Sequence, residues 1–360
     1  MAKIDAFFKL MNDQGASDLH MVSGLPPSLR VNGEIERVKY KVLANDELRG
    51  MLYEIAPETK IKEFEETGDV DFGYEIKGLA RYRANFFMQK NGIGAVFREI
   101  PSEILTVEQL GLPPVIAKLA LLPRGLVLVT GPTGSGKSTT LAAIIDEANK
   151  KRKDHIITIE DPIEFVHKSQ GCIVNHREVG SHTKSFTTAL RGALREDPDI
   201  ILVGELRDLE TISLAIEAAS TGHLVFGTLH TNSAAKTVDR IVEVFPANEQ
   251  PQIRSTLADS IRAVVSQVLF KRADQKGRVA CLEILIANPA VRNLVREGKT
   301  YQIPSSIQTG RQYGMQLLDD AILELLQRGK ITGDDAYTKA NSKAKFREYI
   351  KNPPKDFTEV

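Results

Sequence analysis

Short apolar runs alternate with longer amphipathic stretches through the middle of the chain. The runs cover residues 126–130, 156–159, 200–203 and 224–228. Apolar runs of this length, bounded by polar residues and glycines, predict strands that are buried on both faces, and the stretches between them predict helices. Strands that alternate with helices predict a mostly parallel sheet covered on both sides, which is an α/β fold.

Residues 1–100 show a different pattern, in which short helical stretches mix with segments of alternating polarity such as 81–88 and 94–99. Alternation at every second residue predicts half-buried strands, so we expect a small α+β lobe. Pro101, Gly111, Pro113 and Pro114 prevent any regular element from continuing beyond this lobe. We therefore predict a linker over 101–114.

The remaining boundaries follow from the position of the strand–helix alternation. We predict a main α/β domain over 115–290 and a helical C-terminal region over 291–360. From about Pro246 onward the pattern predicts helices rich in Arg, Leu and Glu, and the last residues predict a loose tail.

The charge balance limits the classes of partner. Lys plus Arg and Asp plus Glu number 47 each, so the chain has no overall basic excess of the kind that attracts nucleic acid. The first residues lack the apolar core of a secretory signal, and the apolar stretch at 119–129 is broken by Pro123 and Arg124. Two widely separated cysteines, Cys172 and Cys281, form no metal-binding or redox pair. We expect a soluble protein of the cytoplasm.

A glycine-rich segment follows the predicted strand 125–130 and precedes a predicted helix. It reads GPTGSGKS, which matches a phosphate-binding loop in the strand–loop–helix context that such a loop requires. Its backbone N–H groups and the helix N-terminus would bind phosphate oxygens, Lys137 would reach the β- and γ-phosphates, and Ser138 would bind Mg²⁺. The predicted nucleotide-binding residues are Gly131, Pro132, Thr133, Gly134, Ser135, Gly136, Lys137, Ser138 and Thr139.

Acidic residues follow two other predicted strands. Glu205 comes after strand 200–203, preceded by Gly204 where many ATPases have an Asp, and we predict that Glu205 orients the metal ion or its water shell. Glu160, Asp161 and Glu164 follow strand 156–159. We assign Glu164 to orienting the attacking water and Glu160 to the metal, while Asp161 is a partner of these groups or a turn residue.

Two histidines flank the predicted strand 224–228. His230 lies past the carboxyl end of the strand, where a polar side chain would meet the γ-phosphate, whereas His223 precedes the strand. We therefore include His230 among the candidate catalytic residues.

The order and spacing of these motifs resemble those of the type II/IV secretion ATPase superfamily. The phosphate loop, the Glu160–Glu164 acidic box, Gly204–Glu205 and the box ending at His230 occur in the family's order. Residues 16–20 (ASDLH) and 291–297 (VRNLVRE) resemble segments of its pilus-retraction members, although Val291 departs slightly from the usual motif.

This resemblance implies a particular assembly. The N-terminal lobe would be PAS-like and the main domain RecA-like, and the chain would form a homohexamer that hydrolyses ATP with Mg²⁺. It would act on an inner-membrane pilus platform protein of the PilC type, peripheral to the membrane, to drive pilus retraction and twitching motility.

The resemblance also suggests roles for basic residues. Arg81, Arg83 and Arg98 lie on predicted strands of the small lobe and would act as arginine fingers, unless they are simply exposed strand residues. The helix over 291–297 would serve retraction rather than hydrolysis. The basic run 150–153 ends a helix, where cations favour the helix dipole.

Three other functions are alternatives to this interpretation. A pilus extension or type II secretion motor typically has an extra N-terminal domain and a four-cysteine zinc insert, and we expect neither in this chain, which has two cysteines. A nucleic-acid translocase would have a basic channel and be stimulated by DNA, and the balanced charge argues against it. A nucleotide switch would bind a partner with little turnover.

Overall fold

The computed structural model describes residues 2–31, 34–100 and 103–350, and these divide into two compact units. One unit comprises Met1–Glu103 with Pro162–Val166, and the other comprises Ile104–Asp161 with His167–Val360. The domain boundaries predicted from the sequence stay predictions. Residues 101–102 of the predicted linker and 351–360 of the predicted tail lie outside the described residues.

The first unit is built on an antiparallel sheet, with strand order β3-β2-β1-β6-β5-β4 among the described residues. Every second residue of β5 from Ala80 to Phe86 is buried, and Phe8 of α1 packs on Tyr82 and Phe97. The elements are α1 (Asp5–Asp13), β1 (Asp18–Val22), β2 (Ser28–Val31), β3 (Glu34–Arg37), α2 (Asn45–Tyr53), α3 (Glu58–Thr67), β4 (Asp69–Ile76), β5 (Ala80–Gln89) and β6 (Gly92–Ile100).

The second unit contains a mostly parallel sheet whose strand order, within the described residues, is β13-β12-β7-β11-β10-β8-β9. Only the β12–β13 pair is antiparallel there. The strands are β7 (Gly125–Thr130), β8 (His155–Glu160), β9 (Ile173–Glu178), β10 (Ile200–Val203), β11 (Leu224–Leu229), β12 (Ile261–Lys271) and β13 (Arg278–Ile286).

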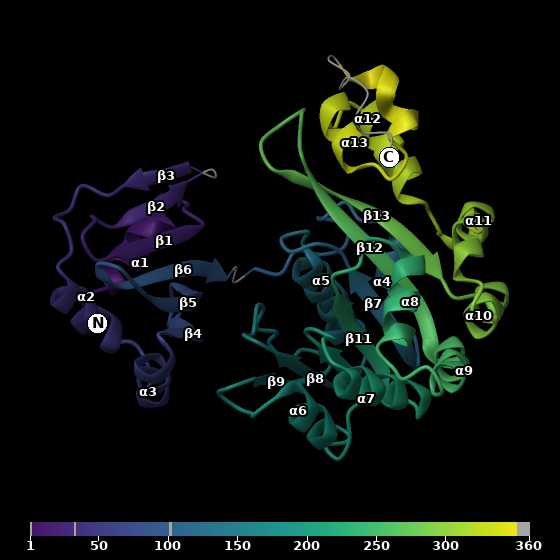
Figure 1. The fold of residues 1–360 in the computed structure, drawn as a ribbon, viewed down its shortest axis with the longest axis horizontal. Helices are drawn as coiled ribbons and strands as arrows, with labels where there is room; N and C mark the ends of the chain where they lie inside the picture. The colour runs from purple at the N-terminus through teal and green to yellow at the C-terminus, as the bar shows by residue number, and fades with distance from the viewer. Residues whose placement is uncertain (1, 32–33, 101–102, 351–360) are drawn as a thin grey trace. The chain divides into compact units, whose positions relative to one another are not determined.

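Helices cover both faces of this sheet (Figure 1). Alternate residues of β7 enter two different apolar clusters, with Leu126 and Leu128 in one and Val127 and Val129 in the other, which explains why β7 is buried throughout. The helices are α4 (Pro114–Leu119), α5 (Lys137–Lys151), α6 (Phe186–Ala193), α7 (Leu209–Ser220), α8 (Ala234–Glu243), α9 (Gln250–Ser260), α10 (Pro289–Arg296), α11 (Ile303–Thr309), α12 (Leu318–Gln327) and α13 (Gly333–Lys339), with 3₁₀ turns at Thr300–Gln302, Arg311–Tyr313 and Lys343–Tyr349.

The prediction of helices from Pro246 onward was wrong in part, because β12 and β13 form a long hairpin within that stretch. Val264, Val265, Phe270 and Ile284 are buried there, and β-branched and aromatic residues of this kind pack well in a sheet. The hairpin completes the edge of the sheet beside β7. Figure 1 shows α12 and α13 close to it, and a fourth apolar cluster joins Phe270 to these helices.

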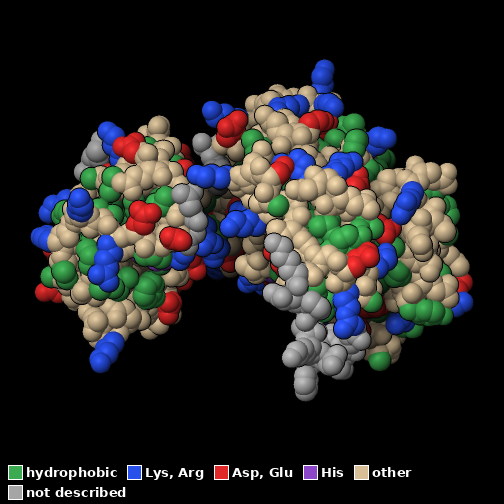
Figure 2. All heavy atoms as spheres, turned by 90° about the horizontal axis from the view of Figure 1, so that it is seen from above, with side chains coloured by type: hydrophobic (Ala, Val, Ile, Leu, Met, Phe, Trp, Pro, Cys, Tyr) green, Lys and Arg blue, Asp and Glu red, His purple; other side chains and the backbone are tan. Residues whose placement is uncertain are grey.

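Both signs of charge occur on the visible face of each unit (Figure 2), in keeping with the equal numbers of basic and acidic residues. Among the described residues, the helices are all too short or too polar to cross a membrane.

Candidate functional site

The phosphate loop connects the buried strand β7 to α5, as the sequence predicts. Gly131, Gly134 and Gly136 all have positive φ angles, of 141°, 76° and 86°. At Gly131 a Cβ atom would come 2.2 Å from the carbonyl oxygen of Gln267, so only glycine fits the close approach of the loop to β12. The loop therefore curls at the N-terminus of α5, where N–H groups and the helix dipole favour an anion.

Lys137, the first residue of α5, folds back over the loop. Its Nζ donates hydrogen bonds to the carbonyl oxygens of Gly131 at 2.9 Å and Pro132 at 3.1 Å. The buried Ser135 Oγ has no hydrogen-bond partner among the described residues. An ammonium group that lies over the loop and an unpaired buried hydroxyl within it fit a phosphate group, which would accept hydrogen bonds from both.

The loop borders a cavity of about 710 Å³, which is large enough for a nucleotide. Three parts of the second unit contribute to its wall: the phosphate loop, the segment after β11, and the end of β12 with neighbouring C-terminal residues. The lining residues are Pro132, Thr133, Gly134, Ser135, His230, Thr231, Asn232, Lys236, Val268, Leu269, Leu318, Lys339 and Asn341.

Glu205 and His230 lie together at the carboxyl edge of the sheet. Since β10 and β11 are parallel neighbours, with Val203 opposite Gly227, the residues that follow the two strands meet. His230 Nε2 lies 3.1 Å from Glu205 Oε1, and the guanidinium of Arg207 lies 2.6 Å from Glu205 Oε2. Burial raises the pKa of Glu205, but Arg207 and His230 outweigh it and hold the pKa below its ordinary value. The carboxylate is thus charged at neutral pH.

Glu160 ends β8, which pairs in parallel with β10, so it lies on the same edge of the sheet as Glu205. Gly204 packs against it: a Cβ at Gly204 would come 3.4 Å from Glu160 Cα and 3.2 Å from the carbonyl oxygen of Ile159. A side chain at position 204 would therefore be tightly packed against the end of β8. Asp161, the next residue, contributes to the raised pKa of Arg207, after Glu205.

The other predicted catalytic acid, Glu164, is exposed and lies in the segment Pro162–Val166, which belongs to the first unit. Its assignment to the attacking water stays a prediction.

Arg81, Arg83 and Arg98 lie on the polar face of the first unit's sheet. Arg83 is directly opposite Arg98 in the β5–β6 pair, and Arg81 is two residues from Arg83 on the same strand. Each arginine pairs with an acid within this unit: Arg81 with Glu75 at 3.8 Å, Arg83 with Asp71 at 3.3 Å and Arg98 with Asp18 at 2.8 Å. Their role as arginine fingers stays a prediction.

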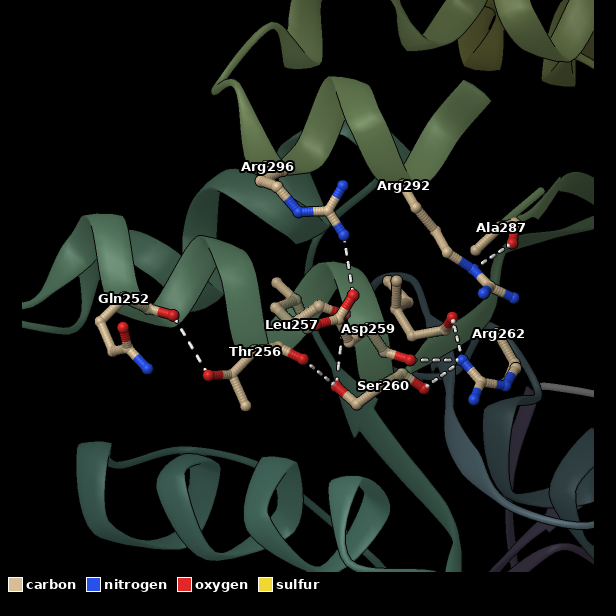
Figure 3. Close-up of polar contacts among 10 residues, drawn as sticks. Gln252, Thr256, Leu257, Asp259, Ser260, Arg262, Ala287, Arg292 and Arg296 are labelled. Atoms are coloured by element: carbon tan, nitrogen blue, oxygen red, sulfur yellow. Dashed lines mark hydrogen bonds and ion pairs between the residues drawn. The ribbon is translucent and has the colours of Figure 1, made fainter. Parts of the chain in front are cut away.

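The predicted helix at 291–297 corresponds to α10 (Figure 3). One of its arginines contacts α9, and the other contacts the residue that follows β13. Arg296 donates to Asp259 at 2.7 Å, and Arg292 Nε donates to the carbonyl oxygen of Ala287 at 2.8 Å. Arg262 Nη1 donates to the carbonyl oxygens at the end of α9, and burial together with Arg292 and Arg124 lowers the pKa of Arg262.

Sequence reasoning missed two polar residues of the site, Arg207 and Gln267. Arg207 was detectable as a cation two positions after Glu205. Gln267 donates to the carbonyl oxygen of Ser135 and accepts from Thr140 Oγ1, but it lies in the stretch predicted as helix, so no signal pointed to it.

A phosphate loop, an acid and a histidine thus follow buried strands at one edge of a parallel sheet. This arrangement is typical of P-loop nucleotide hydrolases. The model of the family described as type II/IV secretion system protein matches residues 91–352. The chain therefore belongs to this family, as its motifs predicted.

Individual relatives match nearly the whole chain. The chain is 55% identical over 333 residues to the type IV pilus retractation ATPase PilT of Pseudomonas aeruginosa, covering 92% of this chain and 96% of that protein. It is 52% identical to a twitching motility protein of Neisseria gonorrhoeae, over 88% of this chain and 84% of that one. A crystal structure of the pilus retraction motor PilT with bound ADP superposes with a TM-score of 0.89, at 44% identity, and covers 96% of this chain and 98% of that chain. The likeness confirms the predicted fold class.

Proposed function

We propose that this chain is an ATPase motor that powers type IV pilus retraction. The observation that carries the proposal is the 55% identity, over nearly the full length of both chains, to a pilus retraction ATPase. The predictions of an ATPase and of a retraction function, both made from motifs, are confirmed by such relatives. The geometry of the second unit adds a chemical basis for hydrolysis.

ATP is the proposed substrate, bound in the cavity beside the phosphate loop. The backbone N–H groups of the loop would hold the phosphates, and Lys137 would exchange its two carbonyl partners for phosphate oxygens. Charge that develops on the transferred phosphoryl group would be balanced by Lys137 and the N-terminus of α5.

Mg²⁺ is the proposed cofactor, and the oxygen donors near the loop suit a hard cation. Ser138 in the first turn of α5, Glu205 and Glu160 are the candidate ligands or water-shell contacts. When bound, the ion would neutralise phosphate charge. The described residues contain no cluster of three His, Cys, Asp or Glu side chains that would hold a metal alone, which suits an ion bound largely by phosphate and water.

His230 has two possible partners, the Glu205 carboxylate and a phosphate at the cavity wall. A hydrogen bond from His230 to Glu205 keeps the imidazole oriented, so its ring is placed to report whether a γ-phosphate is present. Glu164 would align the attacking water.

The assembly is proposed to be a homohexamer that acts on an inner-membrane platform protein of the PilC type. Arg81, Arg83 and Arg98 are proposed to reach the phosphates bound by another copy of the chain. Each would first have to leave its acidic partner, or share it; Arg98 has the most exposed side chain of the three, whereas Arg81 has the longest ion pair.

The test combines turnover with complementation. Wild type, Lys137→Ala and Glu164→Ala would be assayed for steady-state ATP hydrolysis with and without Mg²⁺, with oligomer mass measured on the same samples. Each would also be expressed in a Pseudomonas aeruginosa strain that lacks its own retraction ATPase.

The proposal expects Mg²⁺-dependent turnover by a hexameric wild type that restores twitching, and two variants that assemble but neither turn over nor restore movement. A wild type that binds ATP without turnover would instead favour a nucleotide switch. Turnover stimulated by DNA, without restored twitching, would favour a translocase.

A further inference from the structure

Gln267 lies in β12 at the point where this strand passes the start of the phosphate loop. The register pairs Ser266 with Thr130, the last residue of β7, so Gln267 lies beside the first loop residues. The side chain is 2% exposed. A buried amide at this position needs hydrogen-bond partners, and those it has belong to the loop and its helix.

The two ends of the Gln267 side-chain amide form hydrogen bonds with two different parts of the nucleotide site. Nε2 donates to the carbonyl oxygen of Ser135 at 2.6 Å, and Oε1 accepts from Thr140 Oγ1 at 2.7 Å. Ser135 is in the loop and Thr140 is in α5, so one side chain joins the loop, the helix and the sheet. A second buried bond, between the Thr130 and Ser266 hydroxyls at 2.7 Å, joins the strands just before the loop.

Two of the three loop glycines, Gly131 and Gly136, are packed against the same residue. A Cβ at Gly131 would come 2.2 Å from the backbone oxygen of Gln267, and a Cβ at Gly136 would come 2.8 Å from its Nε2. Gln267 therefore contacts both ends of the glycine-rich segment. Because glycines have wide conformational freedom, a loop that contains several of them loses much entropy when it is ordered.

Lys137 and Gln267 hold the loop in different ways. The Lys137 ammonium donates hydrogen bonds to two carbonyl oxygens of the loop. It would give up these bonds on binding a phosphate. The Gln267 bonds involve buried atoms and do not use the N–H groups that face a phosphate. They are therefore compatible with both the free and the nucleotide-bound loop.

We propose that Gln267 is a positioning residue that holds the phosphate loop in its binding conformation before nucleotide arrives. The inference rests on the proposed function, since it requires that this loop binds the nucleotide. Without the two Gln267 hydrogen bonds, the loop would be ordered only when nucleotide binds. The free energy of ordering the loop would then be subtracted from the free energy of binding, which weakens binding.

The experiment compares Gln267→Glu, Gln267→Met and Thr140→Val with wild type in the full-length protein. Gln267→Glu keeps the shape and the acceptor but turns the donor into a second oxygen facing the Ser135 carbonyl. Gln267→Met removes both bonds at similar volume, and Thr140→Val removes only the bond to α5.

The matched control is Thr211→Val, which removes the hydroxyl of another fully buried threonine. Thr211 bonds Asp208 and Thr187 and does not line the cavity. Three quantities are measured: the Kd of a fluorescent ADP analogue, kcat and KM for ATP, and the Tm without nucleotide.

The loss of one or two buried hydrogen bonds predicts that Gln267→Glu and Gln267→Met raise Kd and KM about tenfold, and that Thr140→Val raises them less. Thr211→Val lowers Tm to a similar extent and leaves Kd within about twofold. The double variant Thr140→Val with Gln267→Met binds the ADP analogue no more weakly than Gln267→Met alone, because Gln267→Met has already removed the hydrogen bond to Thr140.

The inference is overturned if the Gln267 variants fold, lower Tm and bind ADP as wild type does. It is also overturned if Thr211→Val weakens binding equally, since Kd would then follow stability alone. If Gln267→Met fails to fold, Gln267→Glu and Thr140→Val still decide the question. A wild type that binds no ADP would refute the proposed function itself.

Discussion

Replacement of Glu205 by Gln separates the proposed catalytic role of this residue from its contribution to stability. The substitution keeps the size of the side chain and removes its charge. It leaves His230 and Arg207 each facing a neutral amide in place of a carboxylate. If Glu205 orients the metal or its water shell, charge is the property that matters.

The cost in stability is small. Glu205 is 21% exposed but Arg207 is 66% exposed, so solvent screens the pair, and such pairs contribute about 0.5 to 1 kcal/mol. For a unit of this size that is a fall in Tm of about 1 to 4 °C. The cost in catalysis is larger, because removing a charge that stabilises the transition state, here through the metal or its water shell, typically lowers kcat a hundredfold or more, about 3 kcal/mol of the barrier.

The assay is kcat for ATP at saturating Mg²⁺ and nucleotide, with Tm measured on the same samples. The control is Glu196→Gln, which breaks the Arg177–Glu196 pair of 2.8 Å elsewhere in the second unit. We expect about a hundredfold loss of kcat for Glu205→Gln, near-normal kcat for the control, and similar small changes in Tm. A Glu205→Gln enzyme within threefold of wild type would refute the assigned role.

Three further outcomes concern stability. Burial lowers the pKa of His167 to about 4, whereas the pKa in the unfolded chain is near 6.5. As pH falls from 6.5 towards 4 the unfolded state therefore takes up a proton that the folded state does not, and the free energy of unfolding decreases. At pH 5 the loss is about 2 kcal/mol, and thermal melts of His167→Gln should show a flatter pH dependence between 4 and 7. Phe226→Ala, in the fully buried β11, should destabilise the protein by about 3 to 5 kcal/mol in urea unfolding, with unchanged unfolding slope. The Arg296–Asp259 pair is half-exposed, so a double-mutant cycle should give a coupling below about 1 kcal/mol, and a larger value would show that the pair is not screened.

The central strands were predictable because their signal is local. β7, β8, β10 and β11 are apolar runs between polar segments, and such runs bury well from both faces of a sheet. The hairpin of β12 and β13 was missed because its apolar residues follow a true helix, α9, without a glycine or proline between them. Pairing with β7, a contact between distant segments, makes this stretch a strand.

Candidate site residues were predictable where a motif contains them, and unpredictable where only the fold brings them in. Lys137 and Ser138 belong to a contiguous loop motif, and Glu205 and His230 end strands that could be recognised. Gln267 is 130 positions beyond Lys137 and follows no motif. Its contact with Ser135 depends on β12 lying beside β7, and strand order is not encoded in any local pattern.

Strand order also ranks the candidate residues by their distance from the phosphate loop. From β7 the order runs through β11 and β10 to β8, and neighbouring strands are about 4.8 Å apart. His230 follows the strand next to the loop, Glu205 follows the second, and Glu160 ends the third. The proposed metal would contact phosphates held by the loop, so we predict that Glu205 contacts the metal or its water shell more closely than Glu160 does. In strand order His230 comes between the loop and Glu205, so we predict that a change at the phosphates reaches Glu205 through the imidazole and that Glu160 supports Glu205 from the adjoining strand.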